Sequence, residues 1–272
     1  MIINFGGPLL MRDSRANVLT RYKISTKQTG DAEALLTCCV DEIADQLVRA
    51  GGDGCYVASL TEKSSKTYTH AIAFRHGVPP EIEELAELLS TVLTLTPVRG
   101  IDLAISLDWH KQPGENDDLI NTEMGRSIQY TKYATYPNGS SSRREWAKLV
   151  SAMSKFVLEH PEYVEAGAIT APPGHLSNGN SYGEKLAKAI ARETQIPYLP
   201  MTANGERLPQ KESSVIPDLT DEFEMEMSVE GTILIIDDVF HTGSTLAGAA
   251  AAVRRAGASK VLSLTATRTL SR

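Results

Sequence analysis

The sequence predicts an α/β protein, with an open parallel sheet flanked by helices and preceded by a smaller α+β domain. The first observation is an apolar, mostly β-branched run, Ile233 to Ile236, typical of a buried parallel strand and followed by a short loop and an alanine-rich helix. The second is an earlier strand, 166–171, that precedes an amphipathic helix. The third is that the first 110 or so residues have their own order of expected strands and helices. We therefore expect an N-terminal domain of unknown role at 1–118 and the main domain at 123–272.

The N-terminal domain is expected to have the order β-α-β-β-α-β, which is that of a ferredoxin-like unit. Its strands are expected at 18–25, 55–60, 67–74 and 101–107, and its helices at 31–50 and 81–93. Gly51 and Gly52 stop the first helix, and Pro79 and Pro80 open the second. The polar segment 111–118 is typical of a linker or a surface loop.

The main domain is expected to alternate helices and strands. In order, we expect a helix at 142–158, the strand 166–171, a helix at 181–194, a strand at 196–199, a loop at about 202–230, the strand 233–236, a loop at 239–244 and a helix at 245–256. The loop at 202–230 has eight acidic residues against two basic ones, and it lacks hydrophobic periodicity. Loops of that length in compact domains are usually functional or disordered, so a mobile loop is predicted.

Composition limits the class of protein. No apolar run approaches the roughly 18 residues of a membrane helix, and no signal peptide opens the chain, so no membrane partner is expected. The cysteines number three, an odd count that fits a reducing cytoplasm, which is the expected location. The net charge of −7 argues against strong nucleic-acid binding, which needs a basic surface.

Cysteines and histidines of the N-terminal domain are not expected to bind metal. Cys38, Cys39 and Cys55 form no C-x-x-C pair and are too few for a tetrahedral thiolate site, so they are expected to be buried thiols. His70, His76 and His110 are scattered, and we expect them to serve the structure.

The segment after Ile236 has the chemistry of a phosphate site. Gly243 lets the backbone approach a ligand, hydroxyls flank it, and the first N–H groups of the following helix favour an anion. Asp237 and Asp238, at the strand end, can accept hydrogen bonds from sugar hydroxyls or hold a hydrated Mg2+. A ligand with a 5-phosphate, a ribose diol and a metal-bound leaving group would satisfy all of these groups.

Two other interpretations of this segment were weighed. An apolar strand that ends in two aspartates also occurs in ATPases, but that interpretation needs a G-x-x-x-x-G-K-[ST] loop, and the chain has none. The aspartates of an ordinary α/β strand could merely cap the next helix. The continuation Thr242 to Thr245 disfavours that second alternative.

The segment Ile233 to Leu246 resembles the phosphoribosyl-pyrophosphate (PRPP) motif of type I phosphoribosyltransferases. The resemblance implies that Asp237 and Asp238 bind the ribose hydroxyls, and Mg2+ directly or through water. It implies that the PRPP-binding segment continues through Val239, Phe240, His241, Thr242, Gly243, Ser244 and Thr245, the last four being the phosphate loop. His241 stands where the family usually has a small residue, and it either donates to the phosphate or points into solvent.

Two further segments gain a role from the same resemblance. The pyrophosphate loop would be Ala171, Pro172, Pro173, Gly174 and His175, whose alternative is an ordinary strand-to-helix connection. The loop at about 202–230 would close over the site and exclude water. Within it Lys211 is the candidate catalytic residue that meets the pyrophosphate, or else an ordinary solvated lysine.

Within that family the chain resembles the ComF-like branch. The similar positions are Tyr130 to Tyr133, 172–187, Gln210 and the ending 255–268, and the resemblance covers about 125–272. The chain departs from that branch in lacking its N-terminal four-cysteine zinc ribbon.

The resemblance implies an Mg2+-dependent type I phosphoribosyltransferase with a type I phosphoribosyltransferase-like fold. It would transfer ribose 5-phosphate between PRPP and a nitrogenous base, with pyrophosphate as the other product, and we expect a homodimer. One alternative is a non-catalytic PRPP- or nucleotide-binding regulator, or an accessory protein like the ComF-like ones. Another is an interaction protein in which the N-terminal domain does the work.

Overall fold

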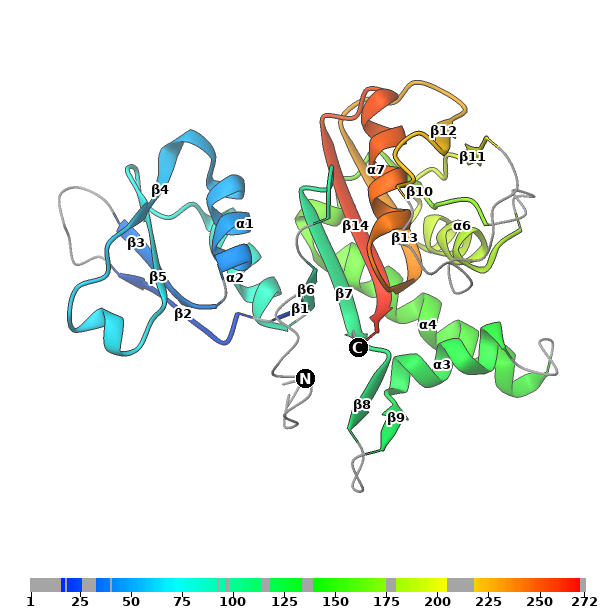
Figure 1. Ribbon diagram of the computed structural model, residues 1–272, viewed down its shortest axis with the longest axis horizontal. Coiled ribbons are helices and arrows are strands. Elements are labelled where there is room, and N and C mark those ends of the chain that lie inside the picture. Colours follow the sequence, from blue (N-terminus) through cyan, green and yellow to red (C-terminus); the bar gives the residue numbers. More distant parts are fainter. Residues whose placement is uncertain are drawn as a thin grey trace. The chain divides into compact units, whose positions relative to one another are not determined.

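The computed structural model describes residues 16–17, 19–25, 33–39, 41–91, 93–95, 98–113, 118–133, 139–174, 180–204 and 218–269. The chain divides into two compact units, Met1–Pro97 and Val98–Arg272 (Figure 1). The division therefore falls earlier than the predicted 118–123. The reason is that the predicted strand 101–107 pairs with the last strand of the chain, within the second unit.

The first unit is an α+β unit with a four-stranded antiparallel sheet in the order β2-β3-β5-β4. Its strands are β2 (Arg21–Ser25), β3 (Glu33–Cys38), β4 (Cys55–Ala58) and β5 (His70–Phe74), its helices α1 (Asp41–Gly51) and α2 (Pro80–Thr91), with short 3-10 turns at Gly52–Gly54 and Ser64–Lys66. Two further short strands, β1 (Ala16–Asn17) and β6 (Leu93–Leu95), pair with each other antiparallel. The core joins the sheet to both helices through Leu35, Ile72, Phe74, Ile43, Leu47, Leu85 and Leu89.

The predicted helix 31–50 is wrong in its first part, where β3 lies. Leu35, Leu36 and Thr37 are consecutive and all buried, because β3 sits between two neighbours in the sheet. Consecutive apolar residues fit a buried strand or a buried helix equally well, so periodicity alone could not separate them. The predicted order β-α-β-β-α-β is wrong as well, because the two strands β2 and β3 both precede α1 and the strand predicted at 101–107 belongs to the second unit.

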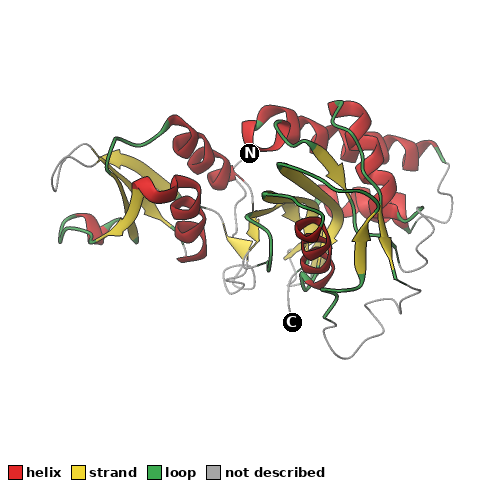
Figure 2. Ribbon diagram, turned by 90° about the horizontal axis from the view of Figure 1, so that it is seen from above, coloured by secondary structure: helices red, strands yellow, loops and turns green. Residues whose placement is uncertain are grey.

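The second unit is built on a parallel sheet in the order β7-β14-β13-β10. The strands are β7 (Leu103–Trp109), β10 (Ala168–Thr170), β13 (Thr232–Phe240) and β14 (Lys260–Arg268), and the helices α3 (Glu123–Lys132), α4 (Ser140–Glu159), α5 (Pro161–Val164), α6 (Tyr182–Thr194) and α7 (Ser244–Arg255). Figures 1 and 2 together show α7 on one face of the sheet and α4 and α6 on the opposite face. The predicted fold class, an open parallel sheet flanked by helices behind a smaller α+β unit, is confirmed.

Buried strands and capped helices explain this arrangement. Residues 233–236 of β13 are all buried, as expected for a strand covered by helices on both faces. A capping box starts α6: the Ser181 hydroxyl accepts from the Glu184 N–H, and the Glu184 carboxylate accepts from the Ser181 N–H at 2.9 Å. The end of β7 meets α3 closely, because a Cβ at Gly125 would lie 2.0 Å from the His110 carbonyl oxygen.

Two loop predictions and one strand prediction change in the structure. The segment 111–118 is no simple loop, since β8 (Lys111–Pro113) pairs antiparallel with β9 (Leu119–Asn121). The predicted strand 196–199 contributes only a single bridge, from Tyr198 to Ile169. The ends of the predicted loop 202–230 form an antiparallel ribbon of β11 (Met201–Ala203) and β12 (Phe223–Met225), while 205–217 lie outside the described residues. Among the residues described, no helix has the length and apolar character needed to cross a membrane.

Candidate functional site

The acid pair lies inside β13, and the strand does not end at Ile236 as the sequence suggested. Pairing with β14 continues as far as Phe240 opposite Arg268, so Val239 and Phe240 are strand residues and not loop residues. On the other side β10 ends opposite Ile235, just before the acids. The two aspartates therefore lie where one neighbouring strand has already stopped, which is the kind of edge at which open α/β sheets bind ligands.

Asp237 is partly buried and its carboxyl group is held by neighbouring backbone. Its Oδ1 accepts a hydrogen bond from the Asp238 N–H at 2.9 Å. The first turn of α6 lies against it, since a Cβ at Gly183 would come within 3.1 Å of Oδ1. Burial, and next the charge of Asp238, raise the pKa of Asp237 to about 8. Without a ligand, this carboxyl group is therefore mostly protonated at neutral pH.

Asp238 is paired with a lysine that the sequence reasoning did not assign to the site. The Lys132 Nζ, at the end of α3, lies 2.5 Å from the Asp238 Oδ2, with side-chain exposures of 30% and 8%. Burial lowers the pKa of Lys132, but the charge and hydrogen bond of Asp238 outweigh it, so the pKa is raised. The ammonium also lies 5.5 Å from the ring centroid of Tyr182 and 5.7 Å from that of Tyr133. The pair thus places a cation beside Asp238, while burial disfavours a charge on the neighbouring Asp237.

The turn after β13 forms an exposed, hydroxyl-rich start to α7. Gly243 is the N-cap residue with a φ of 85°, a left-handed conformation that glycine adopts without strain. The Thr242 and Ser244 hydroxyl oxygens lie 3.1 Å apart across it. Because glycine has no side chain to cap the helix, the N-cap position leaves room for an anion beside the first turn of α7.

Replacing Gly243 with alanine is expected to weaken both the fold and phosphate binding. The left-handed φ costs about 1 kcal/mol, and the new Cβ would lie 3.1 and 3.3 Å from two carbons of the Phe240 ring. Thermal unfolding and calorimetric titration with PRPP measure the two effects. Gly231→Ala is the matched control, since Gly231 has a φ of 70° and open space around it. Equal PRPP affinity in both variants would contradict a role for Gly243 in the site.

Residues that flank the turn fix its position. The exposed His241 ring is hydrogen-bonded through Nδ1 to the Thr269 hydroxyl, at 2.7 Å, just beyond β14. The buried Phe240 ring lies 4.8 Å from the guanidinium of the buried Arg268, which is also 5.9 Å from the centroid of the Trp109 ring. These contacts tie the turn to the last strand of the chain.

The other predicted site residues lie in two places. The structure brings Asp237 and Asp238 together with residues 239–245 on one strand-turn-helix unit. Ala171, Pro172 and Pro173 are buried, and a Cβ at Gly174 would lie 2.6 Å from the Ser181 Cβ, so this loop abuts the start of α6. His175 and Lys211 lie outside the described residues.

Lys132, Tyr182 and Gly183 are neighbours of the acid pair that the sequence reasoning missed. The one available indication was the resemblance at Tyr130 to Tyr133, which contains Lys132 but carried no residue role. Across the described part of the chain, no cluster of three or more His, Cys, Asp or Glu side chains could hold a metal ion. A Mg2+ ion at the acid pair would therefore take its remaining ligands from water and from ligand phosphates, which is its usual behaviour.

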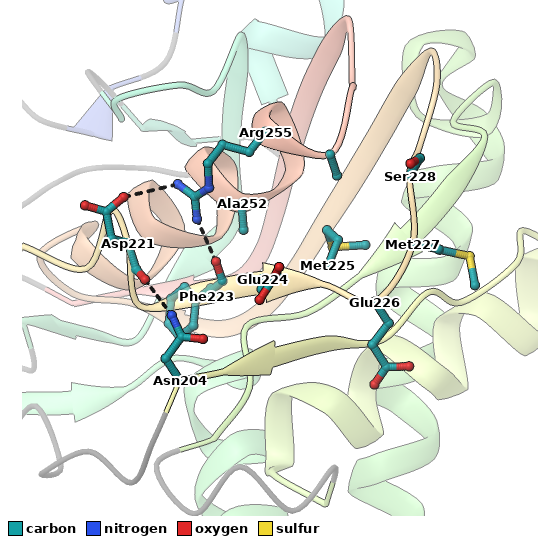
Figure 3. A pocket seen from close by; sticks show the side chains of 11 residues that line it. Asn204, Asp221, Phe223, Glu224, Met225, Glu226, Met227, Ser228, Ala252 and Arg255 are labelled. Carbon is teal, nitrogen blue, oxygen red and sulfur yellow. Dashed lines mark hydrogen bonds and ion pairs between the residues drawn. The ribbon is translucent and has the colours of Figure 1, made fainter.

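A separate open pocket of about 580 Å³ lies at the far end of α7, against β12 (Figure 3). Arg255, in the last turn of α7, donates to the carbonyl oxygens of Thr220 at 2.7 Å and Phe223 at 2.6 Å. The Asn204 side chain donates to the Asp221 carbonyl at 2.9 Å. The helix that follows the turn 242–243 thus fixes the base of the β11–β12 ribbon with its last turn.

Arg255→Met is expected to loosen the β11–β12 ribbon by about 1 kcal/mol, because the charge-assisted bonds to two carbonyls are lost from a side chain that is partly exposed. Hydrogen exchange of the β11 and β12 amides measures this. Arg192→Met, in the last turn of α6, is the control. Unchanged exchange in Arg255→Met would show that the packing of Phe223 alone holds the ribbon.

Solved structures similar to this chain are phosphoribosyltransferases. An adenine phosphoribosyltransferase has 17% identity and a TM-score of 0.36, with 60% of this chain and 94% of that chain covered. A purine phosphoribosyltransferase from Pyrococcus horikoshii Ot3 has 15% identity and a TM-score of 0.32, with coverages of 45% and 82%. An orotate phosphoribosyltransferase from Aeropyrum pernix has 14% identity and a TM-score of 0.31, with coverages of 58% and 72%. No family model and no curated protein matches the chain, and at these identities the likeness concerns the fold.

Proposed function

We propose that the second unit is an Mg2+-dependent type I phosphoribosyltransferase. It binds PRPP and transfers ribose 5-phosphate to or from a nitrogenous base, with pyrophosphate as the other product. The observation that carries the proposal is the short distance along the chain between the acid pair of β13 and the exposed glycine-hydroxyl start of α7. A sugar phosphate carries a diol and a phosphate in one molecule, and these two features offer partners for both.

Different groups of the protein bind different parts of PRPP. The turn 242–245 and the start of α7 bind the 5-phosphate, because the helix dipole favours an anion there. The ribose hydroxyls donate to the carboxylates of Asp237 and Asp238. Because Asp238 already accepts from Lys132, one of its oxygens remains for the ribose. The carboxylates then lie close to the positive charge that develops on the ribose during transfer.

Pyrophosphate needs positive charge as well as hydrogen bonds. Pro172 and Pro173 have no N–H, so the loop at Ala171–Gly174 offers few amides to an anion. Lys132 supplies an ammonium next to the acid pair. We assign it the role of neutralising the negative charge of the ligand beside the acid pair. Asp237 and Asp238 would hold a bound Mg2+, which would supply positive charge for the leaving pyrophosphate.

The experiment is to incubate the whole chain with PRPP, Mg2+ and a panel of purine and pyrimidine bases and to follow pyrophosphate release. Release with one base class supports the transferase and names its acceptor. PRPP binding by calorimetry without release for any base supports the alternative, a regulator that binds PRPP without turnover. Absence of PRPP binding contradicts both and favours an interaction protein whose function lies in the N-terminal unit.

A further inference from the structure

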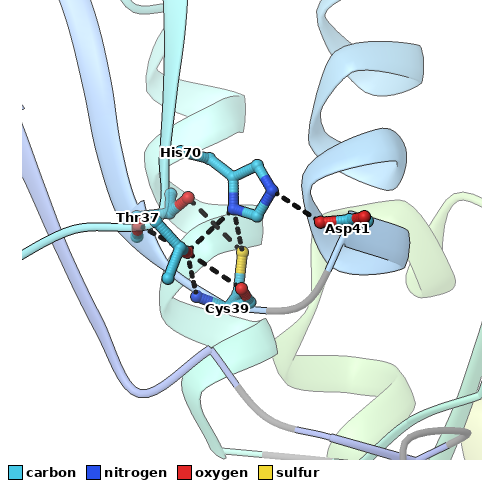
Figure 4. Close-up of polar contacts among 5 residues, drawn as sticks. Thr37, Cys39, Asp41 and His70 are labelled. Carbon is cyan, nitrogen blue, oxygen red and sulfur yellow. Dashed lines mark hydrogen bonds and ion pairs between the residues drawn. The ribbon is translucent and has the colours of Figure 1, made fainter. Parts of the chain in front are cut away.

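A cluster of reactive side chains lies in the first unit, far along the sequence from the acid pair (Figure 4). Cys39 follows the end of β3, His70 begins β5, and Asp41 begins α1. The antiparallel register places Thr37 opposite His70, so the chain just after β3 lies beside the His70 ring. The local fold of the sheet, and not sequence proximity, brings the thiol and the imidazole together.

The three groups stand in the order thiol, imidazole, carboxylate. The Cys39 Sγ lies 3.8 Å from the His70 Nδ1, and the Asp41 Oδ1 lies 3.0 Å from the His70 Nε2. When Nε2–H donates to Asp41, Nδ1 carries the lone pair and faces the sulfur. A nucleophile, a base within reach of it and a group that fixes the tautomer of the base are the parts of a covalent catalytic site.

Thr69 positions the backbone of Cys39 inside this cluster. Its hydroxyl oxygen accepts from the Cys39 N–H at 3.0 Å and lies 2.9 Å from the Cys39 carbonyl and 2.8 Å from the His70 Nδ1. With the lone pair on Nδ1, the Thr69 hydroxyl donates to Nδ1 at rest, and turning this hydroxyl toward the Cys39 carbonyl frees Nδ1 to take the thiol proton during attack. The thiol itself also lies 3.4 Å from the Thr37 hydroxyl, as a donor.

The Cys39 thiol is neutral at rest. Burial raises its pKa to about 11, although the contacts of the sulfur with the Thr37 hydroxyl and the Ala44 N–H act in the opposite direction. A neutral thiol reacts slowly by itself, because the thiolate is the nucleophile. It therefore needs a base that takes its proton during attack, and His70 is placed to be that base.

We propose that Cys39, His70 and Asp41 form a second reactive site, in which the Cys39 sulfur takes an acyl group from an activated ester or thioester. The sulfur forms a bond to the acyl carbon as its proton passes to Nδ1 of His70, and the bond from that carbon to the leaving oxygen or sulfur breaks. Nδ1 then gives its proton to the leaving group. Water cleaves the acyl thioester of Cys39, with Nδ1 taking a proton from the water and returning it to the sulfur as the carboxylic acid leaves.

The probe is p-nitrophenyl acetate, used with the full-length chain. We expect a burst of about one p-nitrophenolate per chain and an acetyl group that mass spectrometry locates on Cys39. Cys55 is the internal control, because its thiol is also partly buried but donates to the carbonyl oxygens of Val48 and Gly52 and has no histidine partner. Its acetylation should be at least about tenfold slower, since general-base assistance is worth about 100-fold or more.

Variants separate the proposed roles. Cys39→Ala should abolish the burst, and Cys55→Ala should leave it intact. His70→Asn should slow the burst at least about 100-fold. Asp41→Asn should slow it much less, because the Asp41 side chain is 92% exposed while that of His70 is 17% exposed.

A rescue experiment covers the case in which His70→Asn disturbs the sheet. In His70→Gly, added imidazole should restore acetylation of Cys39 in a concentration-dependent way, which requires a folded site with a vacant base position. Acetyl groups spread evenly over Cys38, Cys39 and Cys55 would overturn the proposal. So would a burst that is as fast in His70→Asn as in the unsubstituted chain. PRPP binding should be unchanged in Cys39→Ala, so this site and the proposed transferase are tested separately.

Discussion

Replacing Asp237 and Asp238 together with asparagine is expected to weaken PRPP binding at least about 100-fold. Each carboxylate can accept charge-assisted hydrogen bonds from the ribose or hold Mg2+, and losing such a bond costs about 1.5 to 3 kcal/mol. Asparagine keeps the size of the side chain but carries no charge for the metal. Isothermal titration calorimetry with PRPP and Mg2+ measures the loss.

The matched control removes two charges elsewhere on the same unit. Glu159→Gln with Glu193→Gln, on exposed positions of α4 and α6, should leave PRPP affinity unchanged. Because Asp238 pairs with the partly buried Lys132, the double asparagine variant leaves an ammonium without its counter-charge. Adding Lys132→Met removes that ammonium, so the triple variant tests PRPP binding without the cost of an unpaired charge. If the triple variant binds PRPP as well as the unsubstituted chain, the acid pair is not the ribose site.

Local patterns in the sequence predicted much of the second unit. The apolar run 233–236, the acids and the glycine-hydroxyl turn are contiguous, and contiguous residues need no tertiary information to be placed on one strand-turn-helix. The start of α6 was predicted for the same reason, since its capping box is local. The end of β13 was not, because Val239 and Phe240 are strand residues only through their pairing with β14.

Contacts between distant positions could not be predicted. Lys132 and Asp238 are 106 positions apart, and only the packing of α3 against the sheet brings them together. Cys39 and His70 are 31 positions apart and meet through the β3–β5 register. The residues of β3 are predicted as helix because Leu35 and Cys38 lie at a helical spacing that continues through Ile43 and Leu47 of α1.

Asp237→Asn alone is expected to stabilise the ligand-free protein above neutral pH. The pKa of Asp237 is about 8 in the folded chain and near the ordinary 3.8 in the unfolded chain. Between these values the folded state holds a proton that the unfolded state has lost, so the free energy of unfolding falls as pH rises. Asparagine does not titrate, and its side-chain oxygen can still accept from the Asp238 N–H. At pH 9 the expected gain is a few kcal/mol, or roughly 5 to 10 °C in Tm.

Asp238→Asn is expected to act in the opposite direction, although the two aspartates are adjacent. It removes the partner of Lys132, so the free energy of unfolding should fall by about 1 to 3 kcal/mol at pH 6. The fall is smaller than for a fully buried pair, because the Lys132 side chain is 30% exposed. It also removes the charge that helps to keep Asp237 protonated, so Tm should depend less on pH. Tm measured from pH 5 to pH 9 for both variants tests these statements. A fall in Tm for both variants at pH 7 would contradict the raised pKa of Asp237, whereas a rise for Asp237→Asn and a fall for Asp238→Asn would support an unfavourable carboxyl group that is kept where the proposed ligand needs one.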